Sequence, residues 1–110
     1  MSTVPLHQAK AELFRTLGHP VRVRVLELLV QGPKPVRELL AELDIEASSL
    51  SQQLGVLRRA GIVRAVRQGT TVTYSVSTPE VSDLLADGRK ILAAVWTGTE
   101  GMLNELRGSS

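Results

Sequence analysis

Residues 47–61, ASSLSQQLGVLRRAG, carry side chains whose types and spacing indicate binding to a second molecule. As a helix, this stretch places Leu50, Leu54 and Leu57 on one side. The opposite side carries hydroxyl, amide and guanidinium groups and one glycine: Ser48, Ser51, Gln52, Gly55 and Arg59. Such polar groups hydrogen-bond to base edges and phosphates in a DNA major groove. The stretch is therefore a candidate recognition helix, and its central glycine indicates close approach to the backbone.

Positive charge is concentrated in and after this candidate helix. The 110-residue chain has 13 Lys and Arg against 11 Asp and Glu, a net charge of +2. Residues 47–79 nevertheless contain four arginines and no acidic residue: Arg58, Arg59, Arg64 and Arg67. A segregated positive segment is typical of nucleic-acid binding, because phosphate contacts supply much of the affinity. The alternative interpretation is an ordinary solvated surface.

Composition argues against several other kinds of chemistry. The chain has no cysteine, which leaves no disulfide, thiolate metal site or thiol nucleophile. Ser48, Ser49 and Ser51 have no nearby His or Lys base, and no glycine-rich phosphate loop is present, so we do not expect an enzyme. The sequence shows no membrane span or signal peptide, and we expect a cytoplasmic protein.

Three shorter helices precede the candidate recognition helix. The first is expected over residues 6–17, ending at Gly18, and the second begins at His19-Pro20 and ends at Gly32-Pro33. A third helix over residues 36–43 leads through a connector of about three residues into the candidate recognition helix. This arrangement predicts a helix-turn-helix, although any two packed amphipathic helices share its spacing.

A β-hairpin is predicted directly after the recognition helix. Residues 62–67 and 71–77 are rich in β-branched side chains. In the second run Val72, Tyr74 and Val76 alternate with hydroxyl residues, which predicts one buried face. Gln68-Gly69-Thr70 supplies the turn. A hairpin in this place is typical of a wing, whose tip residues Arg67 and Thr70 could contact phosphates or the minor groove. A purely structural hairpin is the alternative.

The last helix is predicted to start at Thr78-Pro79 and to carry a long apolar stripe. The stripe consists of Val81, Leu85, Gly88, Leu92, Val95, Thr99, Met102 and Leu106. It exceeds what the core of so small a domain needs, which predicts dimerisation through terminal helices. The expected interface residues are Leu13, Val81, Leu84, Leu85, Leu92 and Val95. Gly98 and Gly101 predict that the helix kinks or ends near Thr97.

These elements predict one mainly α domain with a small β-hairpin, an α+β winged helix-turn-helix. The expected order is four helices, two strands and a final helix over residues 1–110. We expect a flexible arm at residues 1–5, a winged-helix core at residues 6–78 and a dimerisation helix at residues 79–107. With 43% hydrophobic residues and one each of Trp, Tyr and Phe, the core should be aliphatic.

The combination of LFRTLGHPVRVRVLELL, VRELLAEL, SSLSQQLGVLRRAGIV and RQGTTVTYSV resembles the ArsR/SmtB family of winged-helix transcriptional regulators. The resemblance covers about residues 9–96. It implies a bacterial homodimer, usually a repressor, whose two recognition helices enter successive major grooves of an inverted-repeat operator. By position, it implies that Ser48, Ser49, Ser51 and Gln52 face bases or phosphates. It also implies that Arg59, Arg67 and Thr70 hold the DNA backbone.

The sequence departs from this family at the usual metal-sensing sites. Pro35, Val36 and Arg37 stand where the arsenic and cadmium sensors carry a Cys-Val-Cys pair. The last helix has carboxylates but no His, unlike that of the zinc and nickel sensors, and carboxylates alone bind such metals poorly. The recognition helix also begins with Glu46-Ala47 where a Ser cap and a Gln are common. We expect no metal cofactor and an operator sequence of its own.

His7 and His19 are the two remaining candidates for nickel or zinc. For His19, at the start of the second helix, we favour a local structural role. A dimer could bring His7 near carboxylates on the partner's last helix, but the two histidines form no ligand motif. We favour the interpretation without a metal.

The sequence therefore predicts a sequence-specific DNA-binding regulator, a repressor that acts as a homodimer. One alternative is a winged-helix module that binds proteins only. Another is the DNA-binding half of a two-protein switch whose partner senses the effector. The acid-free segment favours DNA, because a purely protein-binding module has no need to exclude acids there.

Overall fold

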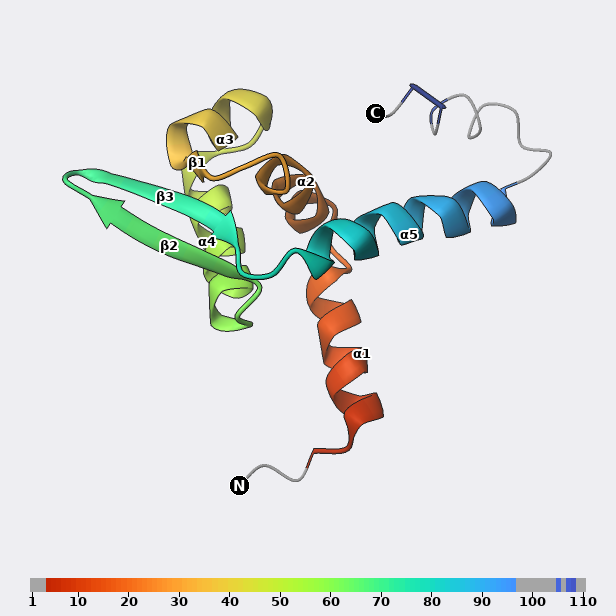
Figure 1. The fold of residues 1–110 in the computed structure, drawn as a ribbon. Coiled ribbons are helices and arrows are strands. Elements are labelled where there is room, and N and C mark those ends of the chain that lie inside the picture. The colour runs from red at the N-terminus through yellow and green to blue at the C-terminus, as the bar shows by residue number, and fades with distance from the viewer. Residues whose placement is uncertain (1–3, 97–104, 106, 109–110) are drawn as a thin grey trace. The chain divides into compact units, whose positions relative to one another are not determined.

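The computed structural model of the chain describes residues 4–96, 105 and 107–108. Its elements are α1 (Leu6–Leu17), α2 (Pro20–Leu29), β1 (Lys34–Pro35), α3 (Val36–Glu42), α4 (Ala47–Arg59), β2 (Val63–Gln68), β3 (Thr71–Val76) and α5 (Glu80–Val95). The chain divides into two compact units, Met1–Pro79 and Glu80–Ser110. In the described part of the chain, every helix is too short or too polar to cross a bilayer. The winged helix-turn-helix predicted from the sequence is confirmed (Figure 1).

The core of the first unit is aliphatic and centres on α2 and α4. The buried side chains are Val25, Leu26, Leu28, Leu29, Leu39, Leu50, Leu54, Leu57, Ile62 and Val63. Burying a leucine or valine side chain stabilises the fold by about 1.5–3 kcal/mol. The three leucines that the sequence placed on one side of α4 are at most 1% exposed. Their burial fixes which side of α4 faces solvent.

Local hydrogen bonds define where α2 begins and where α4 ends. His19 is the N-cap of α2, and its Nδ1 accepts a hydrogen bond from the backbone N–H of Val21 at 3.2 Å. After α4, the N–H of Gly61 donates to Arg58 at 2.9 Å and that of Ile62 to Leu57 at 3.0 Å. This is a Schellman ending, in which Gly61 takes a φ of +78°. It directs the chain from α4 straight into β2.

The sheet contains a strand that the sequence analysis missed. Its order is β1-β3-β2, and all neighbours are antiparallel. In β1, Lys34 pairs with Tyr74 and Pro35 with Thr73. The β2–β3 hairpin closes through Gly69-Thr70, with Gln68 opposite Thr71 and a φ of +64° at Gly69. In Figure 1 this hairpin projects from α2, α3 and α4 as a wing.

The prediction of one buried face on β3 is wrong. All six residues of β3 are half-buried, including Val72, Tyr74 and Val76. Helices α2 and α3 contact β3, but the hairpin extends beyond them, which leaves its side chains only partly covered (Figure 1). On the neighbouring strand Val66 is 52% exposed.

Helices α1 and α5 bury none of their described residues. On α1, Leu6 is 69% and Phe14 57% exposed, and on α5, Ile91 is 61% and Val95 68% exposed. The part of the predicted apolar stripe up to Val95 lies on α5. Several sequence predictions lie outside the described residues: the start of the arm at residues 1–3, the helix end near Thr97, Gly98, Gly101, and the stripe at Thr99, Met102 and Leu106.

Candidate nucleic-acid interface

The solvent side of α4 carries the polar side chains expected from the sequence. Ser48, Ser49, Ser51 and Gln52 are exposed, and so is Arg59 at the last turn. The N-cap residue Glu46 makes no side-chain capping bond. The first two turns of α4 therefore present hydroxyls and an amide to solvent, beside backbone N–H groups that the Glu46 side chain does not cap.

Gly55 makes room for the guanidinium of Arg59. A Cβ built at Gly55 would lie 3.1 Å from Nη1 of Arg59, tighter than an ordinary van der Waals contact. The close approach that the sequence indicated is therefore made by Arg59 of the same helix. Because Gly55 has no side chain, this guanidinium can lie against the exposed surface of α4.

Arg22 on α2 bonds to both α4 and α1, and neither bond was predicted from the sequence. Its Nε donates to Oε1 of Gln53 on α4 at 2.9 Å, and its Nη1 donates to the carbonyl of Thr16 on α1 at 2.8 Å. Gln53 is half-buried on the flank of α4. Arg22 and Gln53 are 31 residues apart, so no local pattern could reveal the bond.

The arginines of residues 4–79 fall into two groups according to the partners of their guanidinium groups. On α1 and α2, Arg15 pairs with Glu12, Arg24 with Glu27, and Arg22 makes the bonds above. Five other arginines of residues 4–79 have guanidinium groups without a hydrogen-bond or ion-pair partner among the residues that the structure describes: Arg37, Arg58, Arg59, Arg64 and Arg67. All five lie on α3, α4 or β2. Their charges remain available to an external anion.

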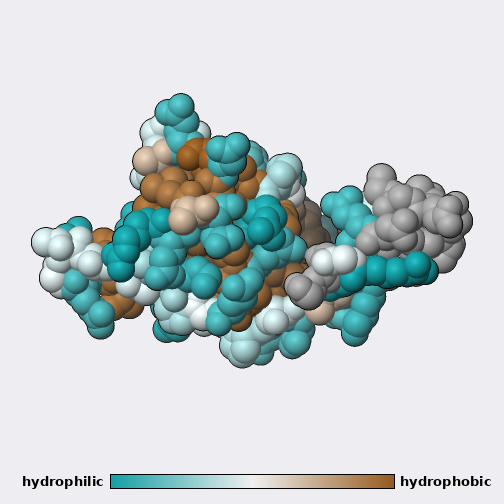
Figure 2. Space-filling model, turned by 90° about the horizontal axis from the view of Figure 1, so that it is seen from above, coloured by the Kyte–Doolittle hydropathy of each residue, from teal (hydrophilic) through white to brown (hydrophobic). Residues whose placement is uncertain are grey.

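The wing places the other predicted DNA contacts at its tip. Arg67 is exposed near the end of β2, opposite Val72, and Thr70 is exposed in the two-residue turn. Arg64 is exposed further from the tip, opposite Ser75. In Figure 2, teal and white residues predominate over the wing at the left of the view. The base of the wing is closed by Ser77, whose hydroxyl donates to Gly61 at 2.6 Å and whose N–H donates to Ile62 at 2.9 Å.

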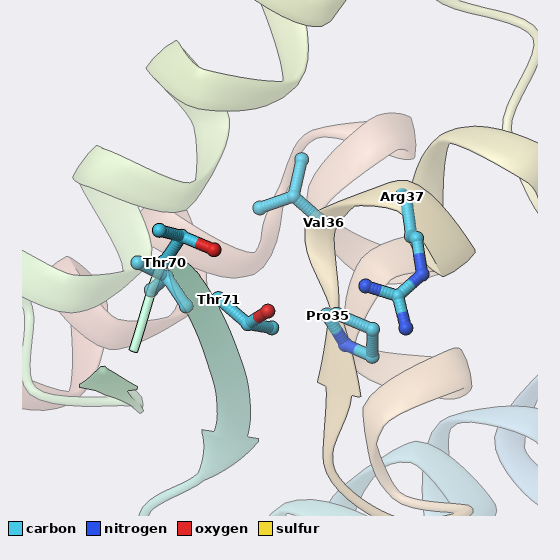
Figure 3. A pocket seen from close by; sticks show the side chains of 6 residues that line it. Pro35, Val36, Arg37, Thr70 and Thr71 are labelled. Carbon is cyan, nitrogen blue, oxygen red and sulfur yellow. The ribbon is translucent and has the colours of Figure 1, made fainter. Parts of the chain in front are cut away.

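A groove of about 270 Å³ lies between the start of α3 and the wing tip. Pro35, Val36 and Arg37 line one side, and Thr70, Thr71 and Val72 line the other (Figure 3). These two segments are more than thirty residues apart in the sequence, and the β1–β3 pairing brings them together. Thr70 was among the binding residues expected from the sequence, whereas Arg37 and Thr71 were not.

The two histidines lie on different elements and form no metal site with other described residues. His7 is exposed near the start of α1, and His19 caps α2. Among the residues described, no three His, Asp or Glu side chains come together as a metal site.

The residues predicted to form the dimer interface differ in exposure. Leu13 on α1 and Leu92 on α5 are each 38% exposed. Of the other predicted interface residues, Val95 is exposed, and three are half-buried: Val81, Leu84 and Leu85.

Comparison with known proteins assigns this arrangement to a family. Residues 19–65 match the family described as bacterial regulatory protein, arsR family. The HTH-type transcriptional regulator Rv0081 of Mycobacterium tuberculosis is 50% identical over 108 residues, which are 97% of this chain and 95% of the relative. The crystal structure of Rv0081 superposes with a TM-score of 0.79 at 51% identity, covering 88% of this chain and 98% of that one. The transcriptional repressor BigR from Xylella fastidiosa gives a TM-score of 0.70 at 34% identity, covering 82% of this chain and 88% of that one. The chain therefore belongs to the ArsR family of bacterial regulatory proteins and is a transcriptional regulator with a winged helix-turn-helix.

Proposed function

We propose that this regulator binds an inverted-repeat operator as a homodimer and represses transcription. The observation that carries the proposal is the set of five arginines without partners on α3, α4 and β2, beside the exposed polar face of α4. DNA is a dense line of phosphates, so cations without internal partners contribute most of their charge to binding it. The repressor name of the related BigR supports the sign of regulation.

In this proposal the recognition helix and the wing have different tasks. Ser48, Ser49, Ser51 and Gln52 face the bases and nearby phosphates, because they occupy the exposed first turns of α4. Arg59 approaches the backbone from the last turn, with its guanidinium over Gly55. Arg67 and Thr70 contact the backbone or the minor groove from the wing.

Dimerisation is proposed through α1 and α5, with the six interface residues named from the sequence. Each helix exposes large apolar side chains and buries none of its described residues. Apolar surface of this kind is expected to be covered by a partner. A two-fold dimer presents two recognition helices, and this geometry requires two half-sites about one helical turn apart.

The effector is proposed to be something other than a metal held by thiolates or by a histidine cluster. The chain has no cysteine, and His19 already uses Nδ1 to cap α2. A small non-thiol ligand, or a separate sensing protein, is the proposed source of the signal. Nickel or zinc at His7 remains the disfavoured alternative.

Footprinting on the DNA upstream of the gene tests the proposal. We expect protection of two symmetric half-sites whose centres are about 10 base pairs apart or a multiple of that spacing. Gln52→Ala should reduce the preference for this site over random DNA, whereas Arg59→Ala should weaken binding to both. Arg24→Ala is the matched control, because Arg24 is already paired with Glu27 on α2. Protection of a single site without symmetry would contradict the inverted-repeat dimer.

A further inference from the structure

We propose that the groove between the start of α3 and the wing tip binds a phosphate of the DNA backbone, through Arg37 and the hydroxyls of Thr70 and Thr71. This inference rests on the proposed function and extends its contact surface. It adds a DNA contact on α3, a helix that supplied none of the DNA-binding residues expected from the sequence.

The lining of the groove has the chemistry that a sugar-phosphate unit requires. Arg37 supplies a guanidinium, whose parallel N–H groups match two phosphate oxygens. In Figure 3 the hydroxyl oxygens of Thr70 and Thr71 point toward the side of the groove formed by α3. Pro35, Val36 and Val72 give the groove an apolar lining against which a deoxyribose can pack.

Arg37 is available for such a contact. It is exposed, and in the described part of the chain its guanidinium has no hydrogen-bond or ion-pair partner. The next residue, Glu38, is also exposed and also lacks a partner there. Adjacent residues of a helix do not face each other, and the positions three and four residues after Arg37 are Leu40 and Ala41, so no carboxylate of α3 is placed to neutralise its charge.

The backbone fixes the two sides of the groove relative to each other. Pro35 pairs with Thr73, two residues from Thr71, so the start of α3 is attached to the outer part of the wing. The two-residue turn at Gly69-Thr70 holds the tip compactly. A preorganised groove loses little conformational entropy when it binds.

An open groove suits a polymer that runs across the protein better than an isolated small ligand. Small-molecule sites generally bury 70–90% of the ligand. Here Arg37 and Thr70 are exposed, and Thr71 and Val72 are half-buried. The groove also adjoins Arg67, which lies opposite Val72 on the wing. A DNA strand held by Arg67 and Thr70 would therefore pass over Arg37.

The test measures how binding to a mixed-sequence 30-base-pair duplex depends on salt. Fluorescence anisotropy of the whole protein would give the slope of log Kobs against log salt. Losing one phosphate contact reduces the steepness of this slope by about 0.9, so Arg37→Ala should reduce it by about 1.8 per dimer. Between 50 and 200 mM salt, the affinity of Arg37→Ala for the duplex should therefore fall by a factor about tenfold smaller than that of the wild type.

Three variants separate this contact from a general loss of charge. Arg24→Ala removes the same charge from α2 and should leave the slope unchanged. Arg37→Lys should retain the slope but bind several-fold more weakly, because an ammonium lacks the paired geometry. Thr71→Val retains the β-branched shape and should weaken binding without changing the slope, because it removes a hydrogen bond and no charge.

Distinct outcomes would overturn this proposal and the proposed function. If the wild-type protein binds the duplex with a steep slope and Arg37→Ala has the same slope, the phosphate contact is wrong and DNA binding stands. If inorganic phosphate raises the melting temperature of the wild type but not of Arg37→Ala, while the DNA slope is unchanged, the groove binds a free anion instead. If the wild type does not bind DNA, the proposed function itself fails.

Discussion

The hydrogen bonds of Arg22 lead to a quantitative prediction about what holds the recognition helix in place. Arg22→Ala removes the 2.9 Å bond to Gln53 and the 2.8 Å bond to the Thr16 carbonyl. Each bond from a charged donor contributes about 1.5 kcal/mol at a half-buried site. We therefore expect Arg22→Ala to lower the free energy of unfolding by about 3 kcal/mol, and Gln53→Ala by about half as much.

A double-mutant cycle isolates the bond between α2 and α4. Because Arg22→Ala already removes this bond, adding Gln53→Ala should cost little more, which gives a coupling energy of about 1–1.5 kcal/mol. Urea unfolding, monitored by circular dichroism, gives the free energy of unfolding of the wild type, the two single variants and the double variant. All four are measured at the same protomer concentration, because the stability of a dimer depends on concentration. With a slope of about 2 kcal/mol per molar urea, Arg22→Ala should move the midpoint by about 1.5 M.

The control is Arg24→Ala, which removes an exposed pair with Glu27 and should cost at most about 1 kcal/mol. The same series should be measured for DNA binding under conditions in which every variant is folded. Arg22→Ala should weaken binding even there, because α4 loses a bond that orients it. Additive effects of Arg22→Ala and Gln53→Ala, within about 0.5 kcal/mol, would refute the link between the helices.

Three further predictions concern the binding surface, the dimer and the effector. Gly55→Ala should leave the free energy of unfolding unchanged or raise it by up to about 1 kcal/mol, yet weaken DNA binding, because the new methyl displaces the guanidinium of Arg59. Equal affinity of the two proteins in a binding titration would show that this position of Arg59 is unimportant. Leu92→Glu should give monomers in sedimentation velocity and lose operator binding, whereas the control Ser82→Glu should remain a dimer and bind the operator. A dimeric Leu92→Glu protein would disprove the assigned dimer interface. Zinc, nickel or arsenite should change operator affinity by no more than a few-fold in anisotropy titrations, and a larger change would reveal a metal site.

Local patterns in the sequence were sufficient to predict the helices and the wing. Leu50, Leu54 and Leu57 repeat at helical spacing, and all three are buried as that spacing requires. Gly69 marked the hairpin turn, because that position needs a positive φ. Residues of these types strongly limit the local backbone conformation, so the secondary structure around them can be predicted without knowledge of tertiary contacts.

Long-range pairing was beyond the reach of such patterns. Strand β1 is only Lys34–Pro35, and it exists because these residues meet Tyr74 and Thr73. The groove at Arg37 depends on that strand. Acidic residues lie close to Arg37 in the sequence, so Arg37 is not part of the acid-free segment that predicted DNA binding. Arg22 was visible as a charge near the start of α2, but its partner Gln53 could be found only in three dimensions.

The salt dependence of operator binding tests the central claim most directly, namely that the unpaired arginines of α4 and the wing bind DNA phosphates. If a dimer makes about six such contacts, affinity for the upstream DNA should fall about 10³-fold between 50 and 200 mM salt. Replacing Arg59 and Arg67 together by Ala should make that fall much shallower, whereas Arg24→Ala should not. Affinity that does not change with salt, or an unchanged slope in the double variant, would contradict the account.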